Sequence, residues 1–338
     1  MAALGRCMRC LVSKSSHFLT SSAGANLTVV RGAKFKRWVR PRLQELYKRR
    51  IEQGPEPERH RSAWPNWNYN AELFAFGKRL GEDFNEETLR IAFTERSYIE
   101  REKQKLQELE LDNTENVLPI DDNQSLAIKG HEISEQYIEA YLRHHLPRVP
   151  EEGIRAITNH LMSDEVMHHV SSNLGIEDLI LCEDFPVQPD TLIRVFKAVI
   201  GGLAEDQGRE RAGLLVRDFI VTQLVGKAVS ELWDIKDPMG LLADVLEKQN
   251  EESPEPRLIW QTGSETIMAA YVVGIYSNKQ MLGKGYGETV TIAEEMAAKD
   301  SLNRIFGLTL ERKPFTFGDT VIDVESSRSN VTLKELTS

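Results

Sequence analysis

Apolar residues recur at helical spacing through the middle of the chain, from about residue 72 to residue 236. Spacings of three and four residues place side chains on one face of a helix, so this pattern predicts an all-α domain over residues 72–236. Its clearest stretch covers residues 123–142, which we expect to form one buried helix. The apolar face of that helix contains Leu126, Ile128, Ile133, Tyr137, Ile138 and Tyr141.

The pattern changes at residue 237, where a second domain is predicted to begin. Asp237 and Pro238 suit the cap and the first turn of a helix. Alternating apolar and polar residues then predict strands over residues 258–262, 270–276 and 281–284. A last helix is expected from about Thr291. The order helix, three strands, helix predicts an α+β domain over residues 237–307.

The two ends of the chain differ from these domains in composition. Residues 1–30 lack acidic residues, are rich in Ser, Thr and Ala, and carry Arg6, Arg9 and Lys14. This composition is typical of a mitochondrial transit peptide, and we expect cleavage near residues 30–33. A disordered terminus is the alternative. Residues 308–338 are polar, and we expect an extended or disordered tail.

Positive charge is concentrated near the N-terminus, although the whole chain has a net charge of -10. Residues 31–71 form an extension in which aromatic residues stand between cations. Cations neutralise phosphates and aromatic rings stack on unpaired bases, so we expect this extension to contact RNA. A solvated tail or further targeting sequence is the alternative. The expected RNA-binding residues are Lys34, Lys36, Arg37, Arg40, Arg42, Lys48, Arg49 and Arg50.

Residues 123–132, Asn-Gln-Ser-Leu-Ala-Ile-Lys-Gly-His-Glu, resemble the ribonuclease III signature N-E-R-L-E-F-L-G-D-A, with matches at Asn123, Leu126 and Gly130. The segment Ala92-Phe-Thr-Glu-Arg-Ser-Tyr98 is similar to the family's A-x-T-H-R-S-Y, with Glu95 in place of His. The resemblance implies a ribonuclease III-like fold, and a dimer-like contact through the signature helix or its internal capping. The apolar face expected to take part contains Leu126, Ile128 and Tyr137.

The same resemblance locates the carboxylates with which the family holds Mg²⁺ beside the scissile phosphate. Those positions fall on Ala127, His131, Arg194 and Lys197. We therefore expect no catalytic residue, no metal and no cofactor, and an electropositive pocket formed by Arg194 and Lys197. That pocket would hold a phosphate or pair with nearby carboxylates. A shifted metal site is the alternative; the carboxylates concerned in either case are Glu132, Glu135 and Glu139.

The second domain is similar to a double-stranded-RNA-binding domain, with Gly283-Lys-Gly-Tyr-Gly287 before its last helix. That family places paired lysines where this chain has Val290 and Thr291, and a histidine in the loop that here covers residues 263–266. Residues 237–307 hold six Lys/Arg against eleven Asp/Glu, so repulsion from an RNA duplex is expected. We expect little duplex binding and favour a protein-binding module.

Other motifs predict no further site. His131-Glu-Ile-Ser-Glu135 lacks the second His of a zinc-binding H-E-x-x-H motif, and Cys7, Cys10 and Cys182 are too few for a disulfide framework. The runs His144-His145 and His168-His169 have no matched ligand spacing. No apolar run approaches the roughly 18 residues of a membrane span.

Together these features identify the chain as a member of the ribonuclease III-like proteins of the mitochondrial large ribosomal subunit. The resemblance implies an all-α ribonuclease III-like domain followed by an α-β-β-β-α double-stranded-RNA-binding-like domain. It also implies a structural, non-enzymatic role in the mitochondrial matrix, supporting translation and subunit assembly, with ribosomal RNA and neighbouring large-subunit proteins as partners. The alternatives are an active mitochondrial endoribonuclease of the same family and a free duplex-RNA-binding processing factor.

Overall fold

The computed structural model describes residues 33–54, 61, 64, 66–108, 122–263, 266–309, 312–318, 324 and 328–337. The chain divides into two compact units, residues 1–59 and residues 60–338. In the first unit the described part is helix α3 (Ala33–Gln53), with side chains described from residue 41 onward. The expected transit peptide at residues 1–30 lies outside the described residues.

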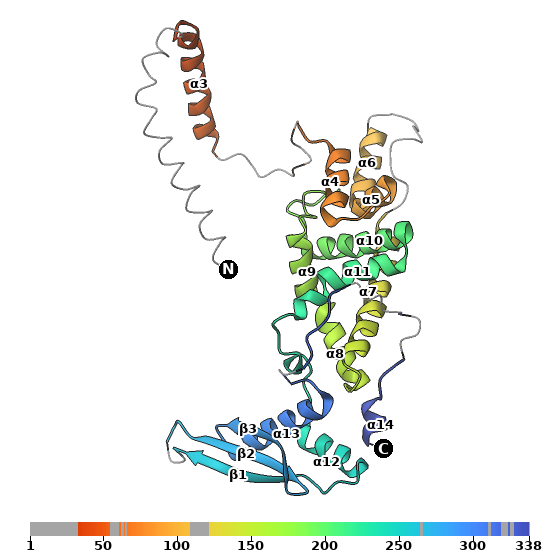
Figure 1. Ribbon diagram of the computed structural model, residues 1–338. Coiled ribbons are helices and arrows are strands. Elements are labelled where there is room, and N and C mark those ends of the chain that lie inside the picture. The colour runs from red at the N-terminus through yellow and green to blue at the C-terminus, as the bar shows by residue number, and fades with distance from the viewer. Residues whose placement is uncertain are drawn as a thin grey trace. The chain divides into compact units, whose positions relative to one another are not determined.

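The second unit begins with an all-helical part, which we call the helical domain (Figure 1). Its order confirms the expected all-α fold. The helices are α4 (Tyr69–Leu80), α5 (Glu86–Phe93), α6 (Arg96–Glu108), α7 (Gln124–His145), α8 (Glu151–Leu161), α9 (Asp164–Asn173), α10 (Pro189–Gln207) and α11 (Arg209–Phe219), followed by short 3-10 turns at Val221–Leu224 and Val229–Glu231.

The chain then forms the sheet domain, in which an antiparallel sheet is combined with two helices, as expected. Its elements are α12 (Pro238–Lys248), β1 (Glu255–Thr262), β2 (Ala270–Ser277), β3 (Gln280–Gly287) and α13 (Val290–Phe306). The strands lie in the order β1-β2-β3, and helix α13 packs on β3 and β2 (Figure 1). Strands β1 and β3 are longer than predicted, because antiparallel pairing extends into polar residues that the apolar alternation does not include.

Helix caps that the sequence supplies fix several of these boundaries. The Asp237 side chain accepts from the Gly240 N–H at 2.9 Å, with Pro238 in the first turn of α12. The Thr289 hydroxyl accepts from the Ile292 N–H at 3.2 Å and begins α13. Helix α13 ends at Gly307, whose positive φ of 71° suits a residue without a side chain.

Helices α7 and α10 cross at the centre of the helical domain. A Cβ built on Gly130 would lie 1.9 Å from the Lys197 carbonyl oxygen, and one built on Gly201 would lie 2.1 Å from that of Leu126. The two backbones therefore touch, which only glycine permits at these positions. Apolar side chains around the crossing are fully buried, among them Ile138, Tyr141, Phe196 and Ile200.

The described C-terminal residues contact the rest of the second unit. We call residues 312–318 and 328–337 the C-terminal strap. The Tyr141 hydroxyl donates to the Thr316 carbonyl at 2.8 Å, and the Asn330 side chain donates to the Val149 carbonyl at 2.8 Å. The strap ends in α14 (Leu333–Thr337), which contacts α12. It thereby joins the helical domain to the sheet domain.

Candidate functional site

The crossing of α7 and α10 brings together the helices that carry the four degenerate family positions. Lys197 lies directly against Gly130, the neighbour of His131. Ala127 is 8% exposed and contributes to the core, while Arg194 is exposed at the helix surface. The helix pairing that the sequence predicts for this site is therefore present, with neutral or cationic side chains at the four positions.

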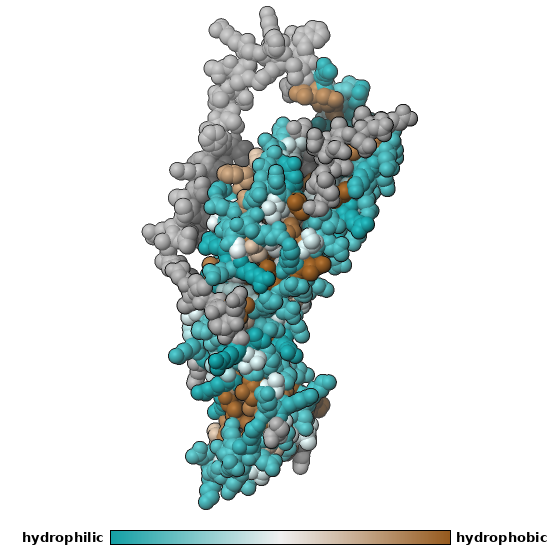
Figure 2. Space-filling model, turned by 90° about the vertical axis from the view of Figure 1, so that its right-hand side faces the viewer, coloured by the Kyte–Doolittle hydropathy of each residue, from teal (hydrophilic) through white to brown (hydrophobic). Residues whose placement is uncertain are grey.

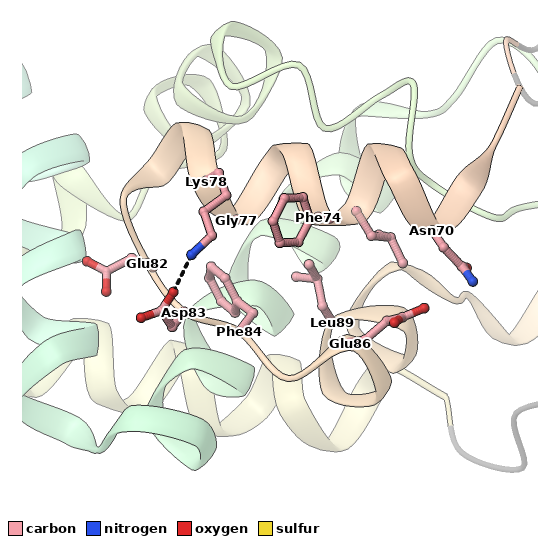
Figure 3. Close-up of a pocket in the computed structure, with 10 residues that line it drawn as sticks. Asn70, Phe74, Gly77, Lys78, Glu82, Asp83, Phe84, Glu86 and Leu89 are labelled. Carbon is pink, nitrogen blue, oxygen red and sulfur yellow. Dashed lines mark hydrogen bonds and ion pairs between the residues drawn. The ribbon is translucent and has the colours of Figure 1, made fainter.

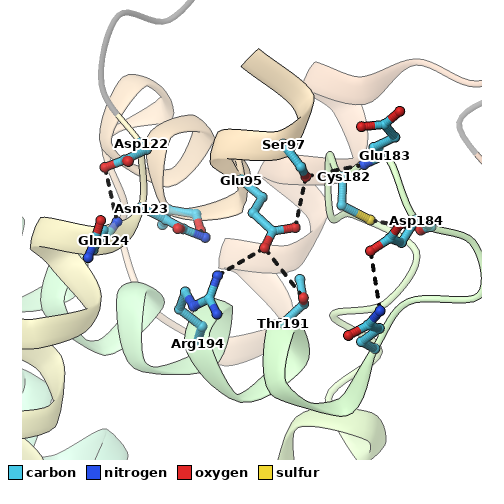
Figure 4. A network of polar contacts seen from close by, with 12 residues as sticks. Glu95, Ser97, Asp122, Asn123, Gln124, Cys182, Glu183, Asp184, Thr191 and Arg194 are labelled. Carbon is cyan, nitrogen blue, oxygen red and sulfur yellow. Dashed lines mark hydrogen bonds and ion pairs between the residues drawn. The ribbon is translucent and has the colours of Figure 1, made fainter. Parts of the chain in front are cut away.

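Glu95 is the centre of a polar network beside this crossing (Figure 4). Its carboxylate accepts from the Arg194 guanidinium at 2.9 Å, from the Ser97 hydroxyl at 3.1 Å and from the Thr191 hydroxyl at 3.4 Å. The side chain of Glu95 is only 14% exposed, whereas that of Arg194 is 46% exposed. The half-buried carboxylate is thus satisfied by three donors, and the charge of Arg194 is compensated.

This pairing corrects the expected electropositive pocket. Arg194 binds Glu95, which is 99 positions away, and not the three glutamates of the signature helix. Among those glutamates, Glu139 pairs with Arg143 at 2.8 Å. Glu132 and Glu135 are exposed on α7. Glu95 stands in place of the family's His, and this difference is the sequence signal that points to the pair.

Lys197 and His131 are the two site residues without a polar partner among the residues that the structure describes. Lys197 is half-buried, and the Nδ1 atom of His131 is buried without a hydrogen bond. The donor set does not suit Mg²⁺, which prefers oxygen ligands: an alanine offers none, and two cations repel the metal. Within the described ranges, no group of three or more His, Cys, Asp or Glu residues could hold a metal ion.

Cys182 lies at the edge of the Glu95 network (Figure 4). Burial raises the pKa of its thiol to about 11, and the nearby charges of Glu95 and Asp184 act in the same direction. The thiol donates to the Asp184 carbonyl at 3.1 Å. A thiol with such a raised pKa holds little thiolate at neutral pH, so Cys182 is not suited to act as a nucleophile.

The apolar face of α7 lies mainly inside the domain. Leu126 and Tyr137 are each 4% exposed, and the Tyr137 ring packs so closely on Gly213 of α11 that a Cβ there would lie 2.3 Å from it. Ile128 points outward and is 55% exposed. Of the two alternatives for this face, internal capping applies to Leu126 and Tyr137, which leaves Ile128 as the outward residue of the three.

The basic extension is helical over α3. The side chains of Arg42, Lys48, Arg49 and Arg50 are exposed, and Arg49 lies 3.5 Å from Glu45. Lys34, Lys36, Arg37 and Arg40 lie on the same helix, but their side chains are outside the described part. Exposed apolar residues also lie along α3, and the sequence did not predict them as a feature of the extension. They are Leu43, Leu46, Tyr47 and Ile51.

In the sheet domain, apolar residues are exposed at the start of α13, where the family's paired lysines would fall, and in the loop between β1 and β2. At the start of α13, Val290, Ile292 and Met296 are 38%, 45% and 46% exposed. In the loop between β1 and β2, Ile267 and Met268 are almost fully exposed. These apolar side chains offer no charge to a phosphate.

A surface pocket lies elsewhere, between α4 and the segment that leads into α5 (Figure 3). Phe74, Phe84 and Leu89 line it, and the Lys78 ammonium pairs with Asp83 at 2.6 Å across its end. None of the predicted site residues lines this pocket. Its other two charged groups, Glu82 and Glu86, are paired with Arg211 and Arg90, which lie outside its lining.

Comparison with known proteins defines the class of the chain and then its family. Residues 68–203 match the model of the "Large ribosomal subunit protein mL44, endonuclease domain", and residues 233–337 match the "MRPL44 dsRNA-binding domain". The fold is therefore a ribonuclease III-like domain followed by a double-stranded-RNA-binding domain. The chain belongs to the family of the large ribosomal subunit protein mL44.

The following proteins are among those similar to this chain. The large ribosomal subunit protein mL44 of Caenorhabditis elegans is 33% identical, over 86% of this chain and 73% of its own length. Ribonuclease 3 of Bacillus cereus strain G9842 is 23% identical, over 70% of this chain and 93% of its own. The nuclease domain of ribonuclease III from Campylobacter jejuni covers 47% of this chain and 97% of its own, with 17% identity and a TM-score of 0.37.

Proposed function

We propose that this chain is a structural component of the mitochondrial large ribosomal subunit, where it supports translation and subunit assembly. Membership of the mL44 family supports the ribosomal role, since the relative from Caenorhabditis elegans is named as a large-subunit protein. The acid-free composition of residues 1–30 supports import into the mitochondrial matrix. None of the helices in the described segments has the length and hydropathy of a membrane span.

We further propose that the ribonuclease III fold of this chain does not cleave RNA. The observation that carries this proposal is the pairing of Arg194 with Glu95 at the place where the family binds metal. The Glu95 carboxylate is engaged by three donors, and Lys197 adds a second positive charge. Two like charges at about 4 Å repel by roughly 4 kcal/mol at intermediate dielectric, so Mg²⁺ would bind poorly.

A cleavage assay tests the enzymatic part of the proposal. The full chain is incubated with duplex RNA and Mg²⁺ beside the ribonuclease 3 of Bacillus cereus as an active control, and we expect products from the control alone. Mg²⁺-dependent cleavage by this chain, abolished by Glu132→Gln or Glu135→Gln, would establish a shifted metal site and overturn the proposal. The matched variant is Glu165→Gln, at an exposed glutamate of α9 outside the crossing.

Sedimentation of a mitochondrial lysate tests the ribosomal part separately. We expect the chain to migrate with the large subunit and to remain there in the presence of Mg²⁺. Migration at the top of the gradient would contradict the ribosomal assignment without affecting the cleavage result. The two experiments can therefore fail independently.

We propose a division of work between the parts of the chain. The extension at residues 31–71 contacts ribosomal RNA, while the domains at residues 72–236 and 237–307 contact neighbouring proteins. The charge distribution supports this division, because the exposed cations of α3 contrast with a net charge of -5 over residues 237–307. Strong, salt-dependent duplex binding that survives loss of the extension's cations would instead support a free RNA-binding factor.

A further inference from the structure

The sheet of the sheet domain has two faces, of which one is covered by α13. A Cβ built on Gly285 would lie 2.2 Å from the Ala297 backbone nitrogen, and one on Gly283 would lie 2.7 Å from that of Ser301. These glycines of β3 therefore face the helix at close contact. Because side chains alternate along a strand, Lys284 and Tyr286 point to the opposite face, which we call the outer sheet face.

The strand register identifies the residues that share this outer face. Trp260 of β1 pairs with Val272 of β2, which pairs with Tyr286 of β3. Trp260 and Tyr286 are 56% and 60% exposed. Cross-strand partners point to the same side, so an apolar and aromatic row crosses all three strands.

A bulge in β1 adds a further apolar side chain to this face. The register shifts between Leu258 and Trp260, and the intervening Ile259 is 49% exposed. Its side chain lies over Gly274 of β2, where a Cβ would come within 2.7 Å of Ile259 Cδ1. The outer sheet face therefore carries an apolar patch centred on β1, of the kind that marks an interaction site.

Strand β1 is also an edge strand without a cover in the part of the chain that the structure describes. All eight of its residues are exposed, and it pairs with β2 only. The opposite edge is different, since the Lys284 N–H of β3 donates to the Asp300 carboxylate of α13 at 3.0 Å. Edge strands in soluble proteins are usually protected by charges or prolines. In β1 these types are confined to its start, Glu255, Pro256 and Arg257, and residues 258–262, Leu-Ile-Trp-Gln-Thr, contain neither.

We propose that β1 is a docking strand, which pairs through its free edge with an extended, basic segment of a partner protein. Such pairing uses the backbone for affinity and the side chains on both faces of the strand for specificity. Charge selects the partner: Glu251 and Glu252 precede β1, and Arg257 is already paired with Glu255 at 2.7 Å. The inference rests on the sheet alone and does not depend on the ribosomal assignment.

The other two occupants of such a surface are disfavoured by the same charges. An unpaired RNA strand could stack on Trp260 and Tyr286, but its phosphates would meet a domain with a net charge of -5. A second copy of this chain, paired through its own β1, would bring two such acidic domains together. A basic polypeptide is the occupant that the charges attract.

Binding of a defined peptide to the full-length chain tests the proposal. The probe is a fluorescent peptide of alternating lysine and valine, compared with the same peptide methylated at every backbone nitrogen. Full methylation removes the N–H donors of both edges and keeps the charged and apolar side chains, so pairing with β1 is lost in the methylated form. Equal binding of both forms would overturn the proposal, because charge or apolar contact alone makes no such distinction.

Point variants locate the binding on β1. We expect Trp260→Ala to weaken peptide binding by at least about tenfold, as for a central aromatic of an interface. The matched control is Phe74→Ala, which removes an equally exposed aromatic residue, 68% accessible, from α4 in the helical domain. Unchanged peptide binding by Trp260→Ala would contradict β1 as the binding site. Tighter binding of an oligouridine probe than of the peptide, or dimerisation that is lost on Trp260→Ala, would contradict a basic polypeptide as the occupant.

Discussion

At Glu95 and Arg194 the charges differ from those in the ribonuclease III family: an acidic residue stands in place of a His, and a basic residue in place of an Asp. Where that family has His and Asp, this chain has Glu and Arg, and the two side chains meet at 2.9 Å. A single substitution at either position would have left a carboxylate beside Glu95 or a cation beside a His. The pair therefore forms a polar contact between α10 and the residue that precedes α6.

A double-mutant cycle on Glu95→Gln and Arg194→Gln measures how strongly these residues are coupled. Because Arg194 is half exposed, we expect a coupling free energy of no more than about 1 kcal/mol in urea unfolding. The control cycle uses Arg96 and Glu100, which lie at the same 2.9 Å on the exposed surface of α6. Coupling at the site smaller than in this control would show that Glu95 is held by Ser97 and Thr191 instead.

Gly130 makes a different kind of prediction at the residue scale, because its contact is with backbone. Gly130→Ala would place a methyl group 1.9 Å from the Lys197 carbonyl oxygen, and neither helix can yield without moving the core. We expect a loss of about 3 kcal/mol in the free energy of unfolding. Gly202→Ala is the control on α10, the helix that Gly130 contacts, since its Cβ meets only the Thr88 methyl group at 3.2 Å. Higher helix propensity should keep that variant within about 1 kcal/mol of the parent.

The C-terminal strap is the element whose stability depends most directly on pH. Its first segment, residues 312–318, is held by His145, whose Nε2 accepts from the Thr316 N–H and whose Nδ1 donates to the Tyr141 carbonyl. Burial lowers the pKa of His145 below its ordinary 6.5. The second segment is held by Glu151, which accepts from the Asn330 N–H at 3.1 Å. Burial opposes ionisation of Glu151, but Arg143 and the Asn330 N–H outweigh it and lower the pKa below 4.5.

These opposite chemistries predict that the two segments loosen in different pH ranges. His145 is a base with a lowered pKa, so its contribution to stability is fully present above pH 6.5 and is lost as the pH falls through the lowered pKa. An acid with a lowered pKa stabilises the fold above 4.5 and loses this effect only at still lower pH. At about pH 5.5, hydrogen exchange should therefore rise in residues 312–318 and stay unchanged in residues 328–337. His145→Gln should abolish this difference between neutral and mildly acidic pH, and simultaneous loosening of both segments would contradict it.

The elements that the sequence predicted are those with a periodic apolar pattern. Helix α7 followed from such periodicity, whereas the close contact of its Gly130 with α10 is evident only in the structure. The sheet domain followed from alternation and from the glycines of β3. The Glu95–Arg194 pair was not predicted: Glu95 in place of the family's His was its signal in the sequence, but sequence gives no distance between residues 99 positions apart. Nor could the strap, since Asn330 binds backbone carbonyls and leaves no periodic signal. The exposure of β1 was missed for a similar reason: alternation does not tell whether a second layer covers a strand.

At the scale of the whole molecule, charge and apolar surface are distributed between its parts. Exposed cations lie on α3, and the sheet domain is acidic with apolar residues on its surface. The face shown in Figure 2 is mainly hydrophilic, with apolar residues gathered in a few separate patches. A chain so divided is suited to bind RNA with one part and proteins with another.

The salt dependence of RNA binding by the full chain tests this division directly. Each lysine or arginine that neutralises a phosphate contributes about 0.7 to 0.9 to the slope of log affinity against log salt concentration. Replacing Arg42 and Lys48 of α3 together by Gln should therefore reduce that slope by about 1.5 and weaken binding of every RNA sequence alike. The matched control replaces Lys279 and Lys284 of the sheet domain by Gln, which removes the same charge from the same chain. If the control lowers the slope as much as the α3 variant does, the sheet domain binds phosphates despite its acidic surface, and the extension is not the RNA-binding part.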